Sequence, residues 1–182
     1  SMTIGVFDGI HLGHKFLINE TIKVAQNKNY NSCIISFSNS PYHFLTKKND
    51  SNNYLSTKDE KTDILSNYKI DDIFLIEFNN EIANTTAYDF LNYINTSLNL
   101  KFLTIGPDFS LGKNKEGNIN YLNKMQNIFD YKLYITKPYL SQKKIVSSTL
   151  VKKLINQKNI IEANKCLGYF YNLTGKVIKG EN

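Results

Sequence analysis

The chain has 182 residues, of which 41% are hydrophobic and 21% charged, enough for one α/β domain with a core of its own. All 22 basic residues are lysines, the net charge is +6, and the lysines are scattered, which argues against a nucleic-acid-binding surface. The two cysteines are too few for a disulfide framework, no apolar run approaches the length of a membrane span, and no secretory signal is present. We therefore expect a cytoplasmic protein with neither a membrane nor a nucleic acid as partner.

The first part of the chain predicts two strands, one helix and a long loop. A short strand over residues 3–7 precedes a helix over residues 13–28, whose apolar positions follow helical spacing. A buried strand is predicted over residues 32–37. Residues 38–56 are polar and predict a mobile surface loop.

The remaining elements alternate between helix and strand. They are a helix from residue 56 to about 68, a strand over 72–78, a helix over 86–98, a strand over 101–105, a loop over 107–117, a helix over 118–129 and a strand over 131–136. The strand over residues 72–78 is nearly all apolar, which is typical of a central parallel strand. The alternation predicts an α/β fold with a doubly wound, mainly parallel five-stranded sheet, whose ligands bind beyond the carboxyl ends of the strands.

The turn between the first strand and the first helix is the strongest candidate site. Gly5 and Gly9 let the backbone turn tightly and approach a ligand closely. The N-terminus of the following helix attracts phosphate, and His11 and His14 are spaced so that both imidazoles can reach the same anion. Three other interpretations stay open: Asp8 caps the helix, the histidines form half of a zinc site with the third histidine and the cysteines, or the histidines have no role.

The sequence from residue 5 to residue 14 reads Gly-x-Phe-Asp-Gly-x-His-x-Gly-His. It resembles the signature of the adenylyltransferase module of bacterial FAD synthetases, the bifunctional riboflavin kinase/FMN adenylyltransferases of the HxGH nucleotidyltransferase superfamily. The resemblance implies a Rossmann-like fold. It also implies that ATP binds at this turn, through Gly5, Phe7, Asp8, Gly9, His11 and His14.

The loop over residues 106–117 is a second candidate site. Phe109 can stack on a flat ring, Asp108 can hold a hydroxyl or a metal-bound water, and Lys115 can attract phosphate. A flexible loop with solvated lysines explains the same residues. The loop resembles the family pattern Gly-x-Asp/Asn-Phe-x-Phe-Gly-x-x-Arg-x-Gly, with leucine for the second aromatic and Lys115 for the arginine. This resemblance implies flavin-binding roles for Phe37, Asp108, Phe109 and Lys115.

A second predicted helix start, at Ser147, Ser148 and Thr149, is the third candidate site. It reads either as an ordinary N-cap with an exposed lysine pair, or as a set of hydroxyls that hold nucleotide while Lys152 reaches a phosphate. It resembles the family's Ile-Ser-Ser-Thr-x-Ile-Arg, with Lys152 in place of the arginine, which keeps the charge but loses the bidentate fork. The resemblance implies ATP binding by all four residues and a catalytic role for Lys152 beside the two histidines.

The resemblance also divides the chain. Residues 2–168 correspond to the FMN adenylyltransferase domain, and residues 169–182 resemble the start of a riboflavin kinase domain whose own motifs are absent, so riboflavin kinase activity is not expected. Around Phe37 the family usually has Thr-Phe-Asp-Pro-His-Pro, of which only Phe37 and Pro41 remain.

The implied reaction transfers AMP from ATP to FMN, giving FAD and pyrophosphate, with Mg²⁺ held by phosphates and water and no protein-only metal site. One alternative is a nucleotidyltransferase with another phosphorylated acceptor. Another is a non-catalytic flavin-nucleotide-binding module, which the replacement of arginine by Lys152 favours. A nucleic-acid binder, suggested by the pI of about 9.1, is the third. The sequence does not indicate the oligomeric state.

Overall fold

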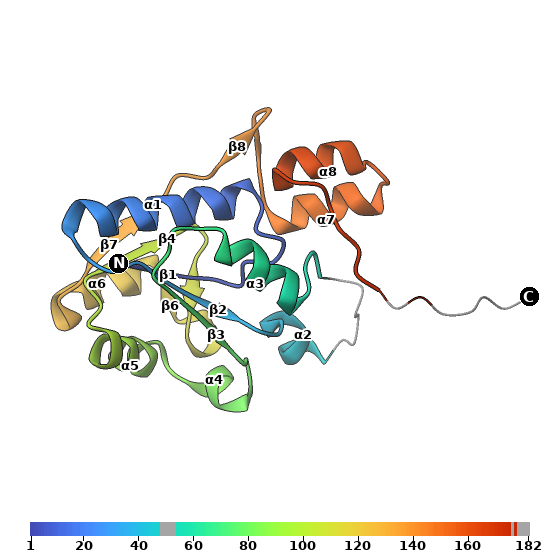
Figure 1. Cartoon of the computed structure of the whole chain (residues 1–182). Helices are drawn as coiled ribbons and strands as arrows, with labels where there is room; N and C mark the ends of the chain where they lie inside the picture. Colours follow the sequence, from blue (N-terminus) through green and yellow to red (C-terminus); the bar gives the residue numbers. More distant parts are fainter. Residues whose placement is uncertain (48–53, 176, 178–182) are drawn as a thin grey trace, which may run out of the picture.

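The computed structural model describes residues 1–47, 54–175 and 177, and its centre is a five-stranded sheet with the order β3-β2-β1-β4-β7 (Figure 1). The strands are β1 (Met2–Ile4), β2 (Cys33–Phe37), β3 (Asp72–Ile76), β4 (Phe102–Ile105) and β7 (Lys132–Ile135). All pairings in this sheet are parallel, with Thr3 opposite both Ile34 and Thr104. The predicted five-stranded, doubly wound fold is confirmed. Because the strand order reverses beside β1, the loops after β1 and β4 meet at the switch point where such sheets bind ligands.

The structure describes eight α-helices. They are α1 (Leu12–Lys28), α2 (Pro41–Thr46), α3 (Lys58–Ser66), α4 (Asn80–Asn84), α5 (Ala87–Leu98), α6 (Ile119–Phe129), α7 (Ser148–Asn156) and α8 (Ile160–Leu167). Of these, α1 and α3 cover one face of the sheet and α5 and α6 the other. One core joins α1 and α3 to the sheet, with buried members Phe7, Ile10, Leu17, Ile18, Ile22, Ile34 and Leu65. The opposite core joins α5 and α6 to the sheet, through residues that include Met2, Ile4, Leu91, Ile94, Leu103, Ile105, Leu122 and Phe129.

A third core lies outside the sheet and stabilises the pair α7–α8. Val151, Ala163 and Leu167 of these helices are fully buried and pack with Leu55 and Val146. Figure 1 shows α7 and α8 on the same side as α2 and the first turn of α3, at the end of the sheet where β2 finishes. The chain therefore places its last two helices over the loops that follow the strands.

Several predicted elements differ from the structure. The strand over residues 72–78 was expected at the centre, but β3 is shorter and lies at the edge, with Phe74 39% exposed. Every residue of β3 is exposed or half-buried, so this apolar run indicated neither a buried strand nor a central one. The predicted loop over residues 38–56 contains α2, which starts with Pro41 after a Ser40 cap, while residues 48–53 of that loop lie outside the described residues.

The predicted loop over residues 107–117 also carries regular structure. It forms β5 (Ser110–Leu111), a short 3₁₀ helix over Lys113–Lys115, and the beginning of β6 (Gly117–Asn118), which pairs antiparallel with β5. A second small hairpin, β8 (Leu140–Ser141) with β9 (Lys144–Ile145), leads into α7. These two-residue strands are too short to leave a periodic signal in the sequence.

Candidate active site

The turn between β1 and α1 is held in an unusual backbone conformation. Phe7 (φ 49°), Gly9 (φ 74°) and Ile10 (φ 32°) all have positive φ, a region that favours glycine. The two bulky members tolerate it because their side chains are anchored in the core, with exposed fractions of 1% for Phe7 and 0% for Ile10. At Gly9 a Cβ atom would lie 2.6 Å from the Cβ of Leu55, so only glycine fits there.

The two histidines of this turn form a stacked pair. Their ring centroids are 3.7 Å apart, with an angle of 17° between the planes. His11 is the N-cap of α1, and its Nδ1 accepts a hydrogen bond from the backbone N–H of His14 at 3.3 Å. A Cβ on Gly13 would lie 3.1 Å from the His11 ring, which explains the glycine between them. The prediction that Asp8 caps this helix is wrong, because the left-handed turn at Gly9 delays the helix start to Leu12.

Both imidazoles are neutral near pH 7. Burial lowers the pKa of His11 to about 4, although the Asp8 carboxylate opposes the shift. Burial also lowers the pKa of His14 well below its usual value, and His11 and Lys61 add to the effect. Because the Nδ1 of His11 accepts a hydrogen bond, its proton is on Nε2. The Nδ1 of His14 is buried without a hydrogen-bond partner among the described residues.

Asp8 connects the turn to α7. Its Oδ1 accepts the backbone N–H of Leu55 at 2.8 Å, and its Oδ2 lies 2.7 Å from the Nζ of Lys152. The hydroxyl of Ser148 donates to the backbone carbonyl of Asp8 at 2.9 Å. The structure thus brings together the first and third candidate sites.

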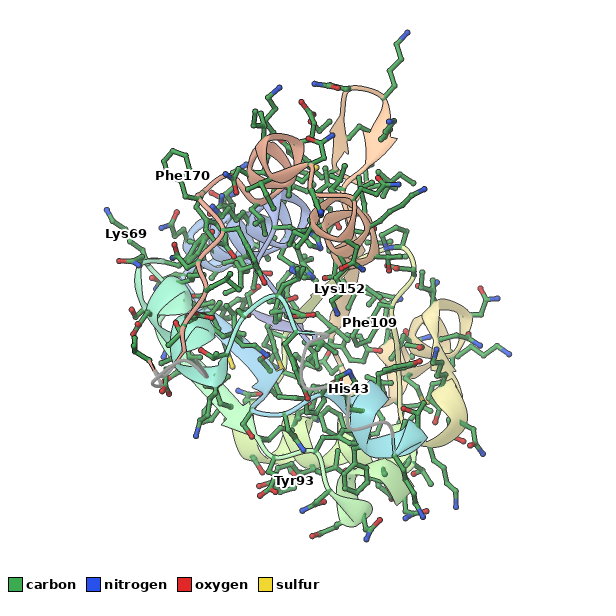
Figure 2. The ribbon with its side chains drawn as sticks, turned by 90° about the vertical axis from the view of Figure 1, so that its right-hand side faces the viewer. His43, Lys69, Tyr93, Phe109, Lys152 and Phe170 are labelled. Carbon is green, nitrogen blue, oxygen red and sulfur yellow. The ribbon has the colours of Figure 1, made fainter. Side chains whose placement is uncertain are left out.

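The third candidate site begins as an ordinary helix start. The Ser147 side chain caps α7 by accepting the backbone N–H of Leu150 at 3.2 Å. Thr149 and Lys152 line a hollow of about 540 Å³ whose opposite wall is α2, including His43. Figure 2 faces the side of the molecule that carries Lys152, Phe109 and His43. The cation of Lys152 therefore borders both Asp8 and this hollow.

The loop after β4 brings only some of its candidate residues toward the histidines. Asp108 is exposed, and its charge acts on His11. Phe109 closes the turn by donating its backbone N–H to the Gly106 carbonyl at 3.3 Å, and its ring packs against the α5–α6 core. Lys115 is exposed, and no described contact joins it to the turn.

The end of β2 has its own aromatic contacts. Phe37 packs edge-on against Phe78, with ring centroids 5.4 Å apart. No described contact joins Phe37 to the histidines or to Phe109. The predicted flavin residues are therefore distributed around the carboxyl end of the sheet rather than clustered in one contact group.

The sequence reasoning missed several residues that hold the turn. Ser56 accepts the backbone N–H of Gly9 at 3.1 Å, and the hydroxyl of Tyr169 donates to the Gly9 carbonyl at 2.7 Å. The Nζ of Lys61 donates to the carbonyls of Val6 and Phe37 at 2.8 and 2.9 Å. These residues lie far from the motifs in sequence, and a serine, tyrosine or lysine alone carries no signal of such contacts.

The segment after α8 returns to the same region. The Nζ of Lys15 lies over the ring of Tyr169, 5.0 Å from the ring centroid. The hydroxyl of Thr174 donates a hydrogen bond to the Glu60 carboxylate at 2.6 Å. Residues 171–174 also line a pocket of about 520 Å³ together with Asp8. The expected second-domain segment at residues 169–182 thus contacts the candidate site through its described part.

The zinc interpretation finds no support in geometry, because in the described ranges no three His, Cys, Asp or Glu side chains gather to hold a metal ion. Cys33 and Cys166 are buried and unpaired with each other. Of the helices that the structure describes, none has the length and apolarity that crossing a membrane requires.

Comparison with known proteins matches this chain to one family. The FAD synthetase family model matches residues 1–150. A bifunctional riboflavin kinase/FMN adenylyltransferase of Buchnera aphidicola is 35% identical over 182 residues, which cover 99% of this chain and 58% of that protein. An FAD synthetase of Listeria monocytogenes is 28% identical over 180 residues, covering 99% of this chain and 73% of that protein.

A solved structure has the same fold. The crystal structure of a macrolide-efflux protein from Streptococcus pneumoniae superposes with a TM-score of 0.80 at 27% identity, covering 93% of this chain and 55% of that one. The chain spans 58% of the length of the Buchnera relative, so it corresponds to one part of such a protein. The match to more than half of the chain shows that it belongs to the FAD synthetase family.

Proposed function

We propose that the chain is an FMN adenylyltransferase, which transfers AMP from ATP to FMN and releases pyrophosphate. One observation carries the proposal: Ser148 and Lys152 of α7 are bonded to Asp8 inside the glycine-rich turn that presents His11 and His14. These contacts support one site built from the two segments that resemble the family's nucleotide motifs. The proposed reaction belongs to residues 2–168, and no riboflavin kinase activity is proposed.

In the proposed reaction an oxygen of the FMN phosphate attacks the α-phosphorus of ATP. A new O–P bond forms, the bond from the α-phosphorus to the bridging oxygen breaks, and pyrophosphate leaves with that electron pair. Such a transfer needs positioning and charge stabilisation more than covalent help from the protein. The neutral His11 donates its Nε2–H to a phosphate oxygen, and the N-terminus of α1 faces the same charge.

Lys152 and Thr149 are proposed to hold the nucleotide from α7, together with Ser147 and Ser148. Mg²⁺ bound to the triphosphate would neutralise charge on the leaving pyrophosphate. The described residues fit such an ion only through phosphates and water, because no three His, Cys, Asp or Glu side chains gather among them to hold a metal ion. The free buried thiols of Cys33 and Cys166 support a reducing, cytoplasmic location.

A second candidate function is a flavin-nucleotide-binding module without catalysis. The observation that favours it is the ion pair of Lys152 with Asp8. The reaction needs the charge of Lys152, and this charge is already paired with a carboxylate. A nucleotidyltransferase with a different phosphorylated acceptor is the third candidate, because the HxGH element specifies the reaction class more closely than the acceptor.

One chromatographic assay separates these candidates. The protein is incubated with FMN, ATP and Mg²⁺, and FAD and pyrophosphate are quantified, with a panel of other phosphorylated acceptors in parallel. We expect FAD from wild type and from Lys124→Met, which removes an exposed lysine on α6. The double variant His11→Ala/His14→Ala should form no FAD above background. Tight FMN binding without pyrophosphate release would instead support the binding module.

A further inference from the structure

Lys61 is a buried lysine at the carboxyl ends of two neighbouring strands. It comes from α3, is only 6% exposed, and donates from Nζ to the carbonyls of Val6, just after β1, and Phe37, the last residue of β2. Lysine is rarely buried to this extent without a partner for its charge. Two carbonyl oxygens provide partial compensation and leave the positive charge available to an anion.

The ammonium of Lys61 has capacity for a further ligand. It carries three N–H donors, and among the described residues only the carbonyls of Val6 and Phe37 accept from it. Burial lowers the pKa of Lys61, and the nearby Asp8 carboxylate opposes the shift. Asp8 is already engaged by Lys152 and by the backbone of Leu55. One carboxylate thus serves two lysines, which leaves a net positive charge beside the two neutral histidines.

Lys61 lines the pocket of about 520 Å³, a size suited to a small-molecule ligand. The wall around it is rich in hydroxyl groups and also includes Asp8; the hydroxyl residues are Ser38, Ser40, Tyr54, Ser56, Thr57, Tyr171 and Thr174. The other carboxylate of this wall, Glu60, is already bonded to the backbone N–H of Thr57 and to the hydroxyl of Thr174. Hydroxyls around a buried cation match the chemistry of a phosphate ester.

This pocket is distinct from the hollow beside α7 but adjoins it. The hollow of about 540 Å³ is lined by Thr149 and Lys152, the pocket contains Lys61, and Ser40 lines both. Asp8 lies between the two cations, since it is ion-paired with Lys152 and lines the Lys61 pocket. A transfer between two phosphorylated molecules requires two neighbouring phosphate-binding places, and each of these spaces has one buried or half-buried lysine.

We propose that Lys61 binds the phosphate of the acceptor, FMN, in the pocket at the ends of β1 and β2, while α7 holds the donor nucleotide. The assignment rests on the proposed adenylyltransferase reaction. Lys61 then has two roles, since the same ammonium orients the Val6 and Phe37 carbonyls and meets the attacking phosphate.

The test compares flavins with and without the phosphate. Lys61→Gln keeps N–H donors for the two carbonyls and removes the charge, whereas Lys61→Met removes both. Affinities for FMN and riboflavin are measured by flavin fluorescence titration, and circular dichroism checks the fold. We expect wild type and Lys124→Met to prefer FMN over riboflavin, and both Lys61 variants to lose about tenfold or more of that preference. Steady-state kinetics should show a raised KM for FMN and an unchanged KM for ATP.

The outcomes separate this inference from the proposed function. If wild type forms FAD but Lys61→Gln retains the full preference for FMN, Lys61 only clamps the strands and the inference is wrong. Equal weakening of FMN and riboflavin binding leads to the same conclusion. If wild type forms no FAD with any acceptor, the proposed function itself fails.

Discussion

The carboxylate of Asp8 and the ammonium of Lys152 lie 2.7 Å apart, although the two residues come from opposite ends of the chain. Both side chains are largely shielded, with exposed fractions of 11% and 30%. Asp8 is also fixed by the Leu55 backbone, so the pair has a defined geometry. This contact, with that of Ser148, joins the glycine-rich turn after β1 to α7.

Replacing Lys152 tests whether its charge is used in the reaction. Lys152→Met should lower the rate of FAD formation by about tenfold or more, because the α7 side of the site loses its cation. It should also cost about 1 kcal/mol of unfolding free energy, since Asp8 loses its partner. Lys152→Arg should retain activity, because arginine keeps the charge and adds a bidentate fork. An unchanged rate in Lys152→Met would show that the cation serves folding alone.

The buried histidines predict a specific pH dependence of stability. The pKa of His11 is about 4 in the folded protein and near 6.5 in the unfolded chain, so only the unfolded chain takes up this proton between those values. Stability should therefore fall as the pH drops from about 6.5 toward 4, by up to about 1.4 kcal/mol per pH unit for each such histidine.

Thermal unfolding as a function of pH measures this effect. His11→Asn keeps a capping side chain and removes the titrating ring, so its melting temperature should depend less steeply on pH over the same interval. A variant that also lacks His14 should be flatter still, since the pKa of His14 is lowered as well. If the melting temperatures of wild type and His11→Asn depend equally on pH, the lowered pKa of His11 is contradicted.

The hydroxyl of Tyr169 links the segment after α8 to the glycine-rich turn. Tyr169→Phe removes its hydrogen bond to the Gly9 carbonyl and should cost about 1 kcal/mol in urea unfolding, together with part of the FAD-forming activity. Tyr93→Phe is the matched control, because Tyr93 is 69% exposed on α5 (Figure 2). If both variants have the same unfolding free energy and activity, the hydrogen bond of Tyr169 to Gly9 does not contribute to stability.

Gly9 is required both for conformation and for space. Gly9→Ala forces an alanine to φ near 74° and places its Cβ 2.6 Å from that of Leu55. We expect a loss of about 2–4 kcal/mol of unfolding free energy. Gly175→Ala should be neutral in the same denaturation experiment, because nothing lies within 4 Å of the added atom. A neutral result for Gly9→Ala would show that the turn can relax around Leu55.

The sequence predicted the sheet and the convergence of two motifs, because alternating strands and helices leave few topologies and place the loop ends at one edge. The sequence predicted Asp8 as the N-cap of α1, whereas the cap is His11. The left-handed turn at Gly9 that causes this difference cannot be predicted from the spacing of the glycines. The sequence also misplaced β3, since its apolar side chains fit a half-covered edge as well as a centre.

Hydrogen bonds made by isolated polar residues could not be predicted from sequence patterns. Lys61 and Tyr169 meet the turn through backbone carbonyls, and a carbonyl has no sequence signature. The flavin-binding roles expected of Phe37, Asp108, Phe109 and Lys115 stay predictions, as do the roles expected of the histidines and Lys152, because contacts within the protein do not test ligand binding.

The bonds from Ser148, Lys152 and Tyr169 to the Asp8–Gly9 turn have a consequence for biosynthesis. On a ribosome the turn is synthesised well before these three partners, which follow Asp8 and Gly9 by 140 to 160 residues. At about 5–20 residues per second, the turn waits roughly 7 to 30 seconds for its partners. A nascent chain that has formed the central strands therefore still lacks these bonds to the turn, so the proposed reaction is not expected before α7 and Tyr169 have been synthesised.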